Sequence, residues 1–238
     1  MKFHIITVFP ELFDGPFRES ILKRAQEKQL LEIELYNLRD FATDKHHQVD
    51  DYPYGGGPGM ILKPDPIFRC LDHVSRNIPV DTRSEYIFLT PQGQQYNQSM
   101  ANEMVEFDHI VLLCGHYKGV DERVREYWKM REISVGDYVL TGGEIPALII
   151  VDTVTRLIPG VISDLNSAFS DSFYNGLLDC PYYTRPEVYK GMKVPDVLLS
   201  GNHAEIDKWR NQKSIERTLE RRKDLINDHG SDDDAGGQ

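Results

Sequence analysis

Three glycine-bearing turns contain the residues of this chain that are best suited to hold a ligand. Each turn follows an apolar run, and their sequences are LTPQG (89–93), CGHYKG (114–119) and LTGGE (140–144). Any one of them alone is more often an ordinary turn. In α/β proteins, however, the carboxyl ends of parallel strands meet at one edge of the sheet, where ligands bind. Together the turns predict one pocket in which backbone groups make most of the contacts.

None of the three turns has the sequence of a common nucleotide-binding loop. They contain neither G-x-G-x-x-G nor the G-K-[ST] ending of a P-loop, which counts against dinucleotide and nucleoside-triphosphate sites of the common kinds. The glycine pair 142–143 precedes Pro146, near the start of an expected helix. This strand–turn–helix pattern indicates a ligand that lies close to the backbone.

A long polar segment, RDFATDKHHQVDDYPYGGGPGM (39–60), carries acids and histidines that could ligate a metal ion. His46 and His47 are adjacent, so they lack the spacing that places two ligands on one face of a helix or strand. We therefore expect no metal in this segment. Its length and its run of glycines indicate close approach of another chain or of a ligand.

Two further charged positions have both a structural and a functional interpretation. Arg156 lies in an otherwise apolar helical run, so its guanidinium needs a partner, which could be purely structural. Asp164 and Asp171 lie in a small, polar stretch without periodicity. They are ordinary solvated acids unless that stretch folds over a site.

The elements that must position these residues alternate between strands and helices. Alternating or continuous apolar runs predict strands, and 3.6-residue periodicity predicts helices, such as the one containing Ile67, Leu71, Val74 and Ile78. The expected strands are 2–9, 31–38, 85–89, 109–113 and 131–135, with a strand-like piece at 138–140 and a turn at 90–94. The expected helices are 17–29, 64–78, 97–107, 120–130 and 145–158. This order predicts an α/β fold with a largely parallel sheet.

The alternation stops after Pro159, where we place a domain boundary. We expect an α/β domain over residues 1–161, a flexible linker over 162–174 and a small helical domain over 175–238. The last domain has one long helical run, from about 203 to 222. Its acidic end, GSDDDAGGQ, has the composition of a disordered tail.

Composition limits the function classes. A net charge of −11 counts against a nucleic-acid partner, although seven basic residues gather between 208 and 223, where the simpler reading is a solvated helix. Three widely spaced cysteines exclude a CxxC zinc or redox motif and favour a reducing cytoplasm. No apolar run approaches the roughly 20 residues of a membrane span. We therefore expect a cytoplasmic protein with no membrane partner.

Six stretches, in this order and spacing, resemble the TrmD family of bacterial tRNA (guanine-37-N1)-methyltransferases, which is of the SPOUT class. The stretches are DDYPYGGGPGM, LTPQGQ, LLCGHYKGVDERV, SVGDYVLTGGEIPA, LLDCPYYTRPEV and LLSGNHAEIDKWR. The resemblance covers residues 1–222. It implies a SPOUT-type α/β domain with a deep C-terminal trefoil knot, plus a small helical C-terminal domain that binds tRNA. It also implies an obligate homodimer in which both subunits form each site.

The resemblance further implies S-adenosyl-L-methionine as cofactor and methyl transfer to N1 of guanine 37 in tRNA, next to the anticodon, which maintains the reading frame. Carried over motif by motif, the cofactor contacts are Leu89, Thr90, Pro91, Gly115, Tyr117, Ser134, Val135, Gly136, Tyr138, Leu140, Gly142, Gly143 and Pro146.

Guanine N1 carries a proton that must leave before the nitrogen can attack, so the reaction needs a general base and a cation near O6. By position in the matching motifs, Asp171 is the expected base and Arg156 the expected cation. We expect Tyr54, Trp209, Arg210 and Lys213 to contact tRNA, because aromatic and basic side chains suit bases and phosphates. Core packing of Trp209 and solvation of the charged residues are the alternatives.

The loop CGHYKG departs from the family pattern at two positions. His116 stands where arginine is frequent, and Lys118 stands where the family has a glutamate associated with magnesium dependence. Lysine does not ligate Mg²⁺, which leaves Asp179 as the candidate ligand. Two other functions stay open: methylation of a ribose 2′-hydroxyl, and RNA binding without catalysis.

Overall fold

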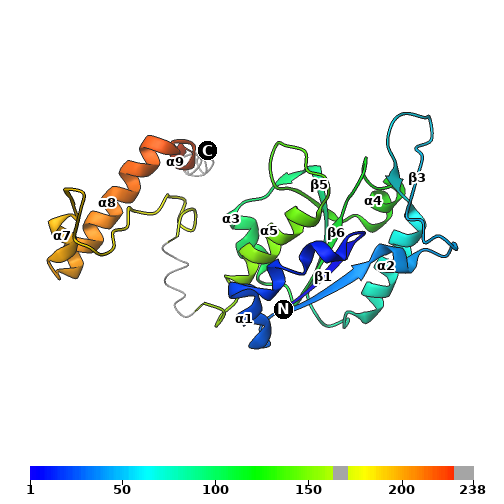
Figure 1. Cartoon of the computed structure of the whole chain (residues 1–238), viewed down its shortest axis with the longest axis horizontal. Helices are drawn as coiled ribbons and strands as arrows, with labels where there is room; N and C mark the ends of the chain where they lie inside the picture. Colours follow the sequence, from blue (N-terminus) through cyan, green and yellow to red (C-terminus); the bar gives the residue numbers. More distant parts are fainter. Residues whose placement is uncertain (163–170, 228–238) are drawn as a thin grey trace, which may run out of the picture. The chain divides into compact units, whose positions relative to one another are not determined.

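The computed structural model describes residues 1–162 and 171–227 (Figure 1). The chain divides at residue 163 into two compact units, Met1–Ser163 and Asp164–Gln238. Asp164, most of the expected linker and the acidic tail from residue 228 onward lie outside the described residues.

The N-terminal unit is built on a five-stranded parallel sheet with the order β2-β1-β6-β5-β7. The strands are β1 Lys2–Thr7, β2 Glu32–Asn37, β5 Ser84–Gln95, β6 His109–Cys114 and β7 Arg131–Ser134. The prediction of a largely parallel α/β sheet is confirmed. This order makes β6, β5 and β7 neighbours, so the segments that follow them start at the same edge.

Helices cover both faces of the sheet (Figure 1). Helices α1 Ser20–Glu27, α3 Gln98–Met104 and α5 Glu144–Thr155 pack on one face, and α2 Pro64–Asn77 and α4 Glu122–Trp128 pack on the other. In β6 the side chains alternate between the two cores, with Ile110 and Leu112 on the first face and Val111 and Leu113 on the second. Alternate strand residues face opposite sides, so both sets are buried and the strand reads as a continuous apolar run.

Two local predictions were wrong. Strand β5 does not end at a turn after Leu89 but continues to Gln95, with a shift in its pairing to β7 between Leu89 and Gln94. Residues 138–140 are not a strand: they form an irregular, exposed segment in which Val139 has 85% of its surface accessible. Apolar residues predict a strand only if the fold buries them, and these three lie beside the pocket described below.

The polar segment 39–60 is less irregular than its composition predicts. It begins with the 3₁₀ helix η3 Leu38–Phe41, and a short antiparallel pair joins β3 Asp50–Asp51 to β4 Ile61–Leu62. Two further 3₁₀ helices, η1 Pro10–Phe13 and η2 Pro16–Arg18, precede α1. Between β3 and β4, four glycines have left-handed backbone angles that other residues rarely adopt: Gly55, Gly56, Gly57 and Gly59.

The described part of the C-terminal unit, residues 171–227, contains a short hairpin and three helices. These are β8 Val188–Tyr189, β9 Met192–Lys193, α7 Asp196–Leu199, α8 His203–Arg221 and α9 Asp224–Asn227. The side chain of Asn202 caps α8 by accepting a hydrogen bond from the backbone N–H of Glu205 at 3.4 Å. Across the described parts of both units, no helix is both long and apolar enough to cross a membrane.

Candidate functional site

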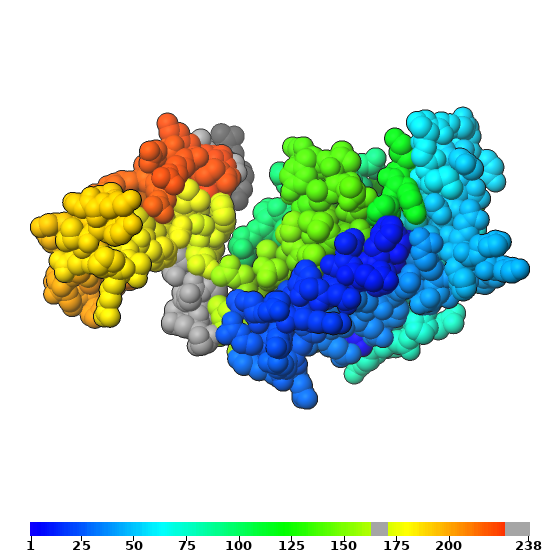
Figure 2. Space-filling model, in the orientation of Figure 1, coloured from blue at the N-terminus to red at the C-terminus, as the bar shows by residue number. Residues whose placement is uncertain are grey.

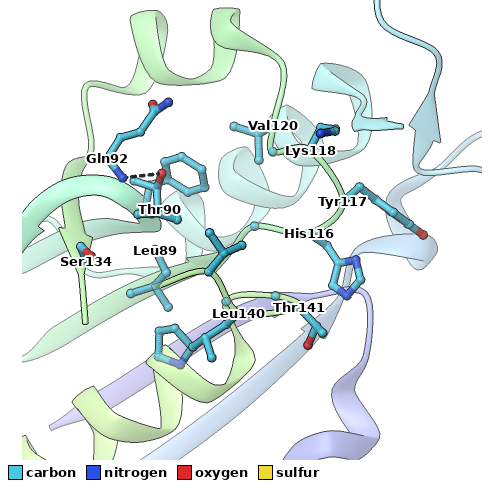
Figure 3. A pocket seen from close by; sticks show the side chains of 18 of the residues that line it. Leu89, Thr90, Gln92, His116, Tyr117, Lys118, Val120, Ser134, Leu140 and Thr141 are labelled. Carbon is cyan, nitrogen blue, oxygen red and sulfur yellow. Dashed lines mark hydrogen bonds between the residues drawn. The ribbon is translucent and has the colours of Figure 1, made fainter. Parts of the chain in front are cut away.

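A pocket of about 730 Å³ lies at the carboxyl ends of β6 and β7, beside the irregularity in β5 between Leu89 and Gln94. Figure 3 shows Thr90 and Gln92 on one side of it and His116 and Tyr117 on the other. The three predicted turns supply half of the residues that line it. All thirteen residues expected to contact the cofactor line it: Leu89, Thr90, Pro91, Gly115, Tyr117, Ser134, Val135, Gly136, Tyr138, Leu140, Gly142, Gly143 and Pro146. The structure thus brings the predicted set together, while cofactor binding itself stays a prediction.

The first wall is an excursion of β5. Leu89 pairs with Ile133 of β7, residues 90–93 leave the ladder, and Gln94 then pairs with the same Ile133. A Cβ at Gly93 would lie 2.3 Å from the backbone nitrogen of Ile133 and 2.4 Å from the carbonyl carbon of Glu132. Only glycine lets the chain return to the strand here.

The second wall forms where the segment after β7 reaches the end of β6. The backbone N–H of Gly143 donates to the carbonyl of Gly115 at 2.8 Å, and His116 and Gly142 form an antiparallel bridge. Because β5 lies between β6 and β7 in the sheet, this segment passes the end of β5 before α5 begins.

The glycine pair 142–143 lies where the chain packs closely against itself. A Cβ at Gly142 would lie 2.2 Å from Glu144 Oε2 and 2.6 Å from His116 Cδ2, and one at Gly143 would lie 2.6 Å from Cys114 Cα. We predicted this pair from close approach of a ligand. In the structure, the crossing of two loops is sufficient reason for Gly143, whose neighbours are backbone atoms, whereas the neighbours of Gly142 are side-chain atoms.

A buried carboxylate stands behind this crossing. Glu144 is only 2% exposed, in the first turn of α5, where it accepts a hydrogen bond from Thr7 Oγ1 at 2.7 Å. The helix N-terminus favours a negative charge there. Burial, together with the nearby Glu144 carboxylate, raises the pKa of the Cys114 thiol well above its usual value. Cys114 therefore stays protonated and is not a nucleophile in this site.

Arg125 on α4 is a pocket residue that the sequence analysis missed. Its guanidinium donates to both carboxylate oxygens of Glu132 on β7, at 2.8 and 2.6 Å, and to Gln92 Oε1 at 2.7 Å. Hydrogen bonding to Glu132 raises the pKa of Arg125 further above its usual value. The only signal in the sequence was an arginine in an amphipathic helix, which occurs on most solvated helices. The structure makes it a link between α4, β7 and the 90–93 excursion.

The rim of the pocket is apolar and exposed. Tyr138 is 54% accessible, Val139 85% and Leu140 37%. The hydroxyl of Tyr138 donates to the carbonyl of Val135 at 3.1 Å, which closes this segment into a compact turn. Water-exposed apolar side chains next to a pocket indicate a surface that a ligand or another chain covers.

The two expected catalytic residues do not line this pocket. Arg156 is the C-cap residue of α5, ten residues beyond Pro146, which corresponds to about 15 Å along a helix. Asp171 belongs to the C-terminal unit, where its carbonyl accepts the backbone N–H of Tyr174 at 3.4 Å. Their catalytic roles stay predictions.

The expected tRNA contacts differ in how available they are. Tyr54 is fully exposed in the glycine-rich segment, whereas Trp209 is partly buried, with its ring 6.4 Å from that of Tyr183. Arg210 forms an exposed ion pair with Asp207 at 3.6 Å, and Lys213 binds Glu216 at 2.6 Å. Exposed pairs of this kind contribute little stability, so a phosphate can displace the carboxylate at low cost.

The residues present do not fit a magnesium site. Asp179, the expected ligand, is engaged with Ser172, whose hydroxyl donates to Oδ1 at 2.7 Å. Among the described residues, no group of three or more His, Cys, Asp or Glu side chains is arranged to hold a metal ion. Lys118 lines the pocket of about 730 Å³ and brings a cation where an acid would be needed. We derive no catalytic step from a metal.

Comparisons with known proteins give a consistent result over nearly the whole chain. The family model described as tRNA (Guanine-1)-methyltransferase TrmD matches residues 1–228. A protein of Dehalococcoides mccartyi strain CBDB1 named tRNA (guanine-N(1)-)-methyltransferase is 53% identical over 226 residues, which span 95% of this chain and 90% of that protein. Proteins of the same name from Desulforamulus reducens and Clostridioides difficile strain 630 are also 53% identical. Those alignments cover 96% and 94% of this chain, and 89% and 97% of the relatives.

Proposed function

The chain belongs to the tRNA (guanine-1)-methyltransferase family TrmD, and on that premise we propose that it methylates N1 of guanine 37 in tRNA with S-adenosyl-L-methionine as donor. It is thus a tRNA methyltransferase that acts on guanine N1. The observation that supports the donor is the pocket, because three loops from adjacent strands bring all thirteen expected contact residues together. Its volume of about 730 Å³ falls in the range of small-molecule and cofactor sites.

The walls of this pocket suit an amphipathic, nucleoside-containing ligand. Leu89, Pro91 and Leu140 provide apolar surface, and the glycine-rich turns present backbone N–H and C=O groups. The bound cofactor supplies an electrophilic methyl group. The protein must orient the guanine towards it, remove the proton on N1 and exclude water.

In this proposal the carboxylate of Asp171 accepts the proton of N1. The guanidinium of Arg156 stabilises the negative charge that spreads to O6. Deprotonated N1 would then attack the methyl carbon while the bond from that carbon to the sulfonium sulfur of the cofactor breaks. The electron pair of that bond would stay on sulfur, S-adenosyl-L-homocysteine would leave, and the negative charge on O6 would disappear. Arg156 lies about 15 Å along α5 from Pro146 and does not line the pocket of its own chain in the described structure.

This separation supports a homodimer in which each site takes residues from both chains. The sequence EIPALIIVDTVT makes α5 apolar on nearly all sides, yet Ile145 is 48% exposed near the exposed pocket rim. A helix that is apolar all round is normally buried. A second copy of the chain is the natural cover for this surface.

We also propose the division of labour that the sequence predicted. Residues 1–161 bind the cofactor, 162–174 link the units and carry the base, and 175–238 bind tRNA. The division of the chain at residue 163 supports this boundary. The trefoil knot is supported by the path of the segment after β7, which passes the end of β5 to pair at the end of β6. A tRNA substrate and three free cysteines, Cys70, Cys114 and Cys180, support a cytoplasmic location.

The test is transfer of a labelled methyl group from S-adenosyl-L-methionine to a tRNA transcript with guanine at positions 36 and 37, followed by digestion to locate the product. We expect N1-methylguanosine at position 37 from the native chain and almost none from Asp171→Ala. A methylated ribose would assign the ribose-methylating activity instead. No product, with cofactor still bound, would assign RNA binding without catalysis. An Asp171→Ala variant as active as the native chain would remove Asp171 from its role.

A further inference from the structure

A second hollow, of about 520 Å³, lies within the C-terminal unit. One face of this unit is visible in Figure 2, where the segment around residues 180–200 (yellow to gold) lies against α8 (orange). The residues that line the hollow come from this segment and from α8: Pro181, Tyr182, Tyr183, Thr184, Arg185, Glu187, Val194, Leu198, Leu199, Ile206 and Arg210.

Hydrogen bonds within the same unit hold the wall of the hollow. Just before it, the backbone N–H of Leu178 donates to Thr218 Oγ1 at 2.9 Å, and Ser214 Oγ donates to the carbonyl of Leu178. Within the wall, the backbone N–H of Val194 donates to the carbonyl of Glu187 at 3.0 Å. A site whose walls are held without a ligand loses little entropy when it binds one.

The lining of the hollow combines apolar, aromatic and cationic groups with one carboxylate, that of Glu187. Val194, Leu198 and Ile206 provide apolar surface. Tyr183 is half exposed, with its ring tilted by 53° to that of Trp209. Arg185 and Arg210 add two guanidinium groups. An aromatic face beside guanidinium groups is the combination that binds an unstacked base and its phosphate.

The charge of the residues around the hollow is compatible with an anionic occupant. Residues 171–227 contain ten Lys and Arg against nine Asp and Glu, whereas residues 1–162 contain 17 Lys and Arg against 24 Asp and Glu. A polyanion therefore meets less repulsion at residues 171–227 than at residues 1–162.

We propose that this hollow holds one unpaired nucleotide of the tRNA substrate, with its base stacked on Tyr183 and its phosphate bound by Arg185 and Arg210. The proposal rests on the proposed function, because it takes tRNA as the substrate. A hollow of about 520 Å³ accommodates one nucleotide. A paired duplex keeps its bases stacked inside the helix and offers none to the pocket.

The test uses the full-length chain and two probes, a fluorescein-labelled single-stranded RNA octamer and a blunt RNA duplex of the same length. Fluorescence anisotropy gives the Kd for each probe, and methyl transfer gives kcat and the KM values for tRNA and cofactor. The variants are Tyr183→Ala, Tyr183→Phe and Arg185→Gln. The matched control is Tyr189→Ala, which removes another exposed tyrosine of the same unit that does not line the hollow.

We expect Tyr183→Ala to raise the Kd for the single strand and the KM for tRNA by roughly tenfold, while Tyr183→Phe and Tyr189→Ala leave both within about twofold. The KM for the cofactor and kcat should not change. Arg185→Gln should reduce the slope of log Kd against log salt by about 0.7, the value for one phosphate contact to a single strand. The phenylalanine and glutamine variants keep the test valid if the alanine variant does not fold.

Equal effects of Tyr183→Ala and Tyr189→Ala on both quantities would overturn the proposal, as would tighter binding of the duplex. A change in sedimentation with unchanged RNA affinity would assign the hollow to a second copy of the chain and also overturn it. Failure of the proposed function is a separate result, since the native chain would then make no N1-methylguanosine whatever its affinity for the octamer.

Discussion

At the residue scale, the pocket depends on positions where two backbone segments meet without room for a side chain. Gly93 is the clearest of them, because its neighbours are the backbone atoms of Glu132 and Ile133 and not the flexible ends of side chains. Backbone of a central strand cannot move aside cheaply. The excursion at 90–93 therefore exists only if residue 93 is glycine.

We expect Gly93→Ala to lower the free energy of unfolding by at least about 2–3 kcal/mol, because a Cβ would overlap the β7 backbone. Urea unfolding measures this loss, and calorimetry with S-adenosyl-L-methionine should show weakened binding. Gly15→Ala is the control, since a Cβ there meets nothing within 4 Å and its φ is −73°. Equal stabilities of the two variants would contradict the close approach of residue 93 to the backbone of β7.

Arg125 acts on the pocket through Gln92 and is a positioning residue. We expect Arg125→Lys to raise the KM for the cofactor about tenfold with a smaller change in kcat, because lysine cannot bind Glu132 with two parallel bonds and reach Gln92 as well. Arg123→Lys is the matched control, as Arg123 pairs with Asp121 and does not line the pocket. If both variants keep the native KM, the 90–93 excursion does not need this link.

The lysine at position 118 makes a chelator experiment informative. With tRNA folded beforehand and free of added metal, we expect EDTA to leave cofactor affinity and methyl transfer unchanged, because the described residues hold no arrangement of acids for Mg²⁺. Ca²⁺ added back after the chelator controls for tRNA folding. Full loss of transfer that only Mg²⁺ restores would contradict this expectation.

At the scale of elements, β1 and β6 are joined by more than their backbone ladder. His4, which is 1% exposed, lies between Tyr36 Oη and His109 Nδ1, at 3.0 Å from each. Burial lowers the pKa of His4 to about 4 from 6.5. Between these two values the unfolded chain binds a proton that the folded chain does not. Acid therefore favours unfolding across this range.

The contribution of a neutral His4 to stability is complete above pH 6.5 and is lost as the pH falls towards 4. The shift of His4 corresponds to a loss of about 3 kcal/mol. Urea unfolding of the full chain in a Trp209→Phe background, where Trp128 reports on the N-terminal unit, measures this dependence. His4→Phe should flatten the curve in that interval, whereas exposed His73→Gln should leave it unchanged. A native curve as flat as that of His4→Phe would assign the acid sensitivity to other groups.

At the scale of the whole molecule, the proposed homodimer predicts that each site takes residues from both chains. Leu140→Arg, at the exposed rim, should block the pocket without disturbing the core, and Asp171→Ala should remove the base. If Asp171 serves the pocket of the other chain, mixing the two inactive variants restores activity. After random exchange of subunits, about half of the dimers are heterodimers, and each heterodimer has one intact site of its two. The mixture should therefore have about a quarter of native activity.

Sedimentation of the native chain and of both variants is the control for this mixing experiment, and each should have about twice the 27.4 kDa mass of one chain. An inactive mixture of stable dimers would show that Asp171 serves the pocket of its own chain. A monomeric, active native chain would remove the homodimer from the proposal.

The sequence by itself determined the local elements of this protein and the type of its sheet. The spacing of Ile67, Leu71, Val74 and Ile78 indicated one buried face, and the structure buries all four residues. Such periodicity, like the alternation of strands and helices, records burial within a single element. That information is local, so it can be read from the sequence without knowledge of the fold. The motifs also contained the thirteen residues that line the pocket, although not their arrangement.

Only the tertiary structure decided which elements became neighbours. The strand order β2-β1-β6-β5-β7 places three separate turns at one edge. The crossing of residues 142–143 against 115–116 fixes glycine at position 143 for a reason that no local pattern contains. The segment 138–140 was mispredicted as a strand, and the link made by Arg125 was missed. Both errors have the same cause. Whether an apolar or charged side chain is buried, bridging or exposed depends on segments distant in sequence, and periodicity does not record those contacts.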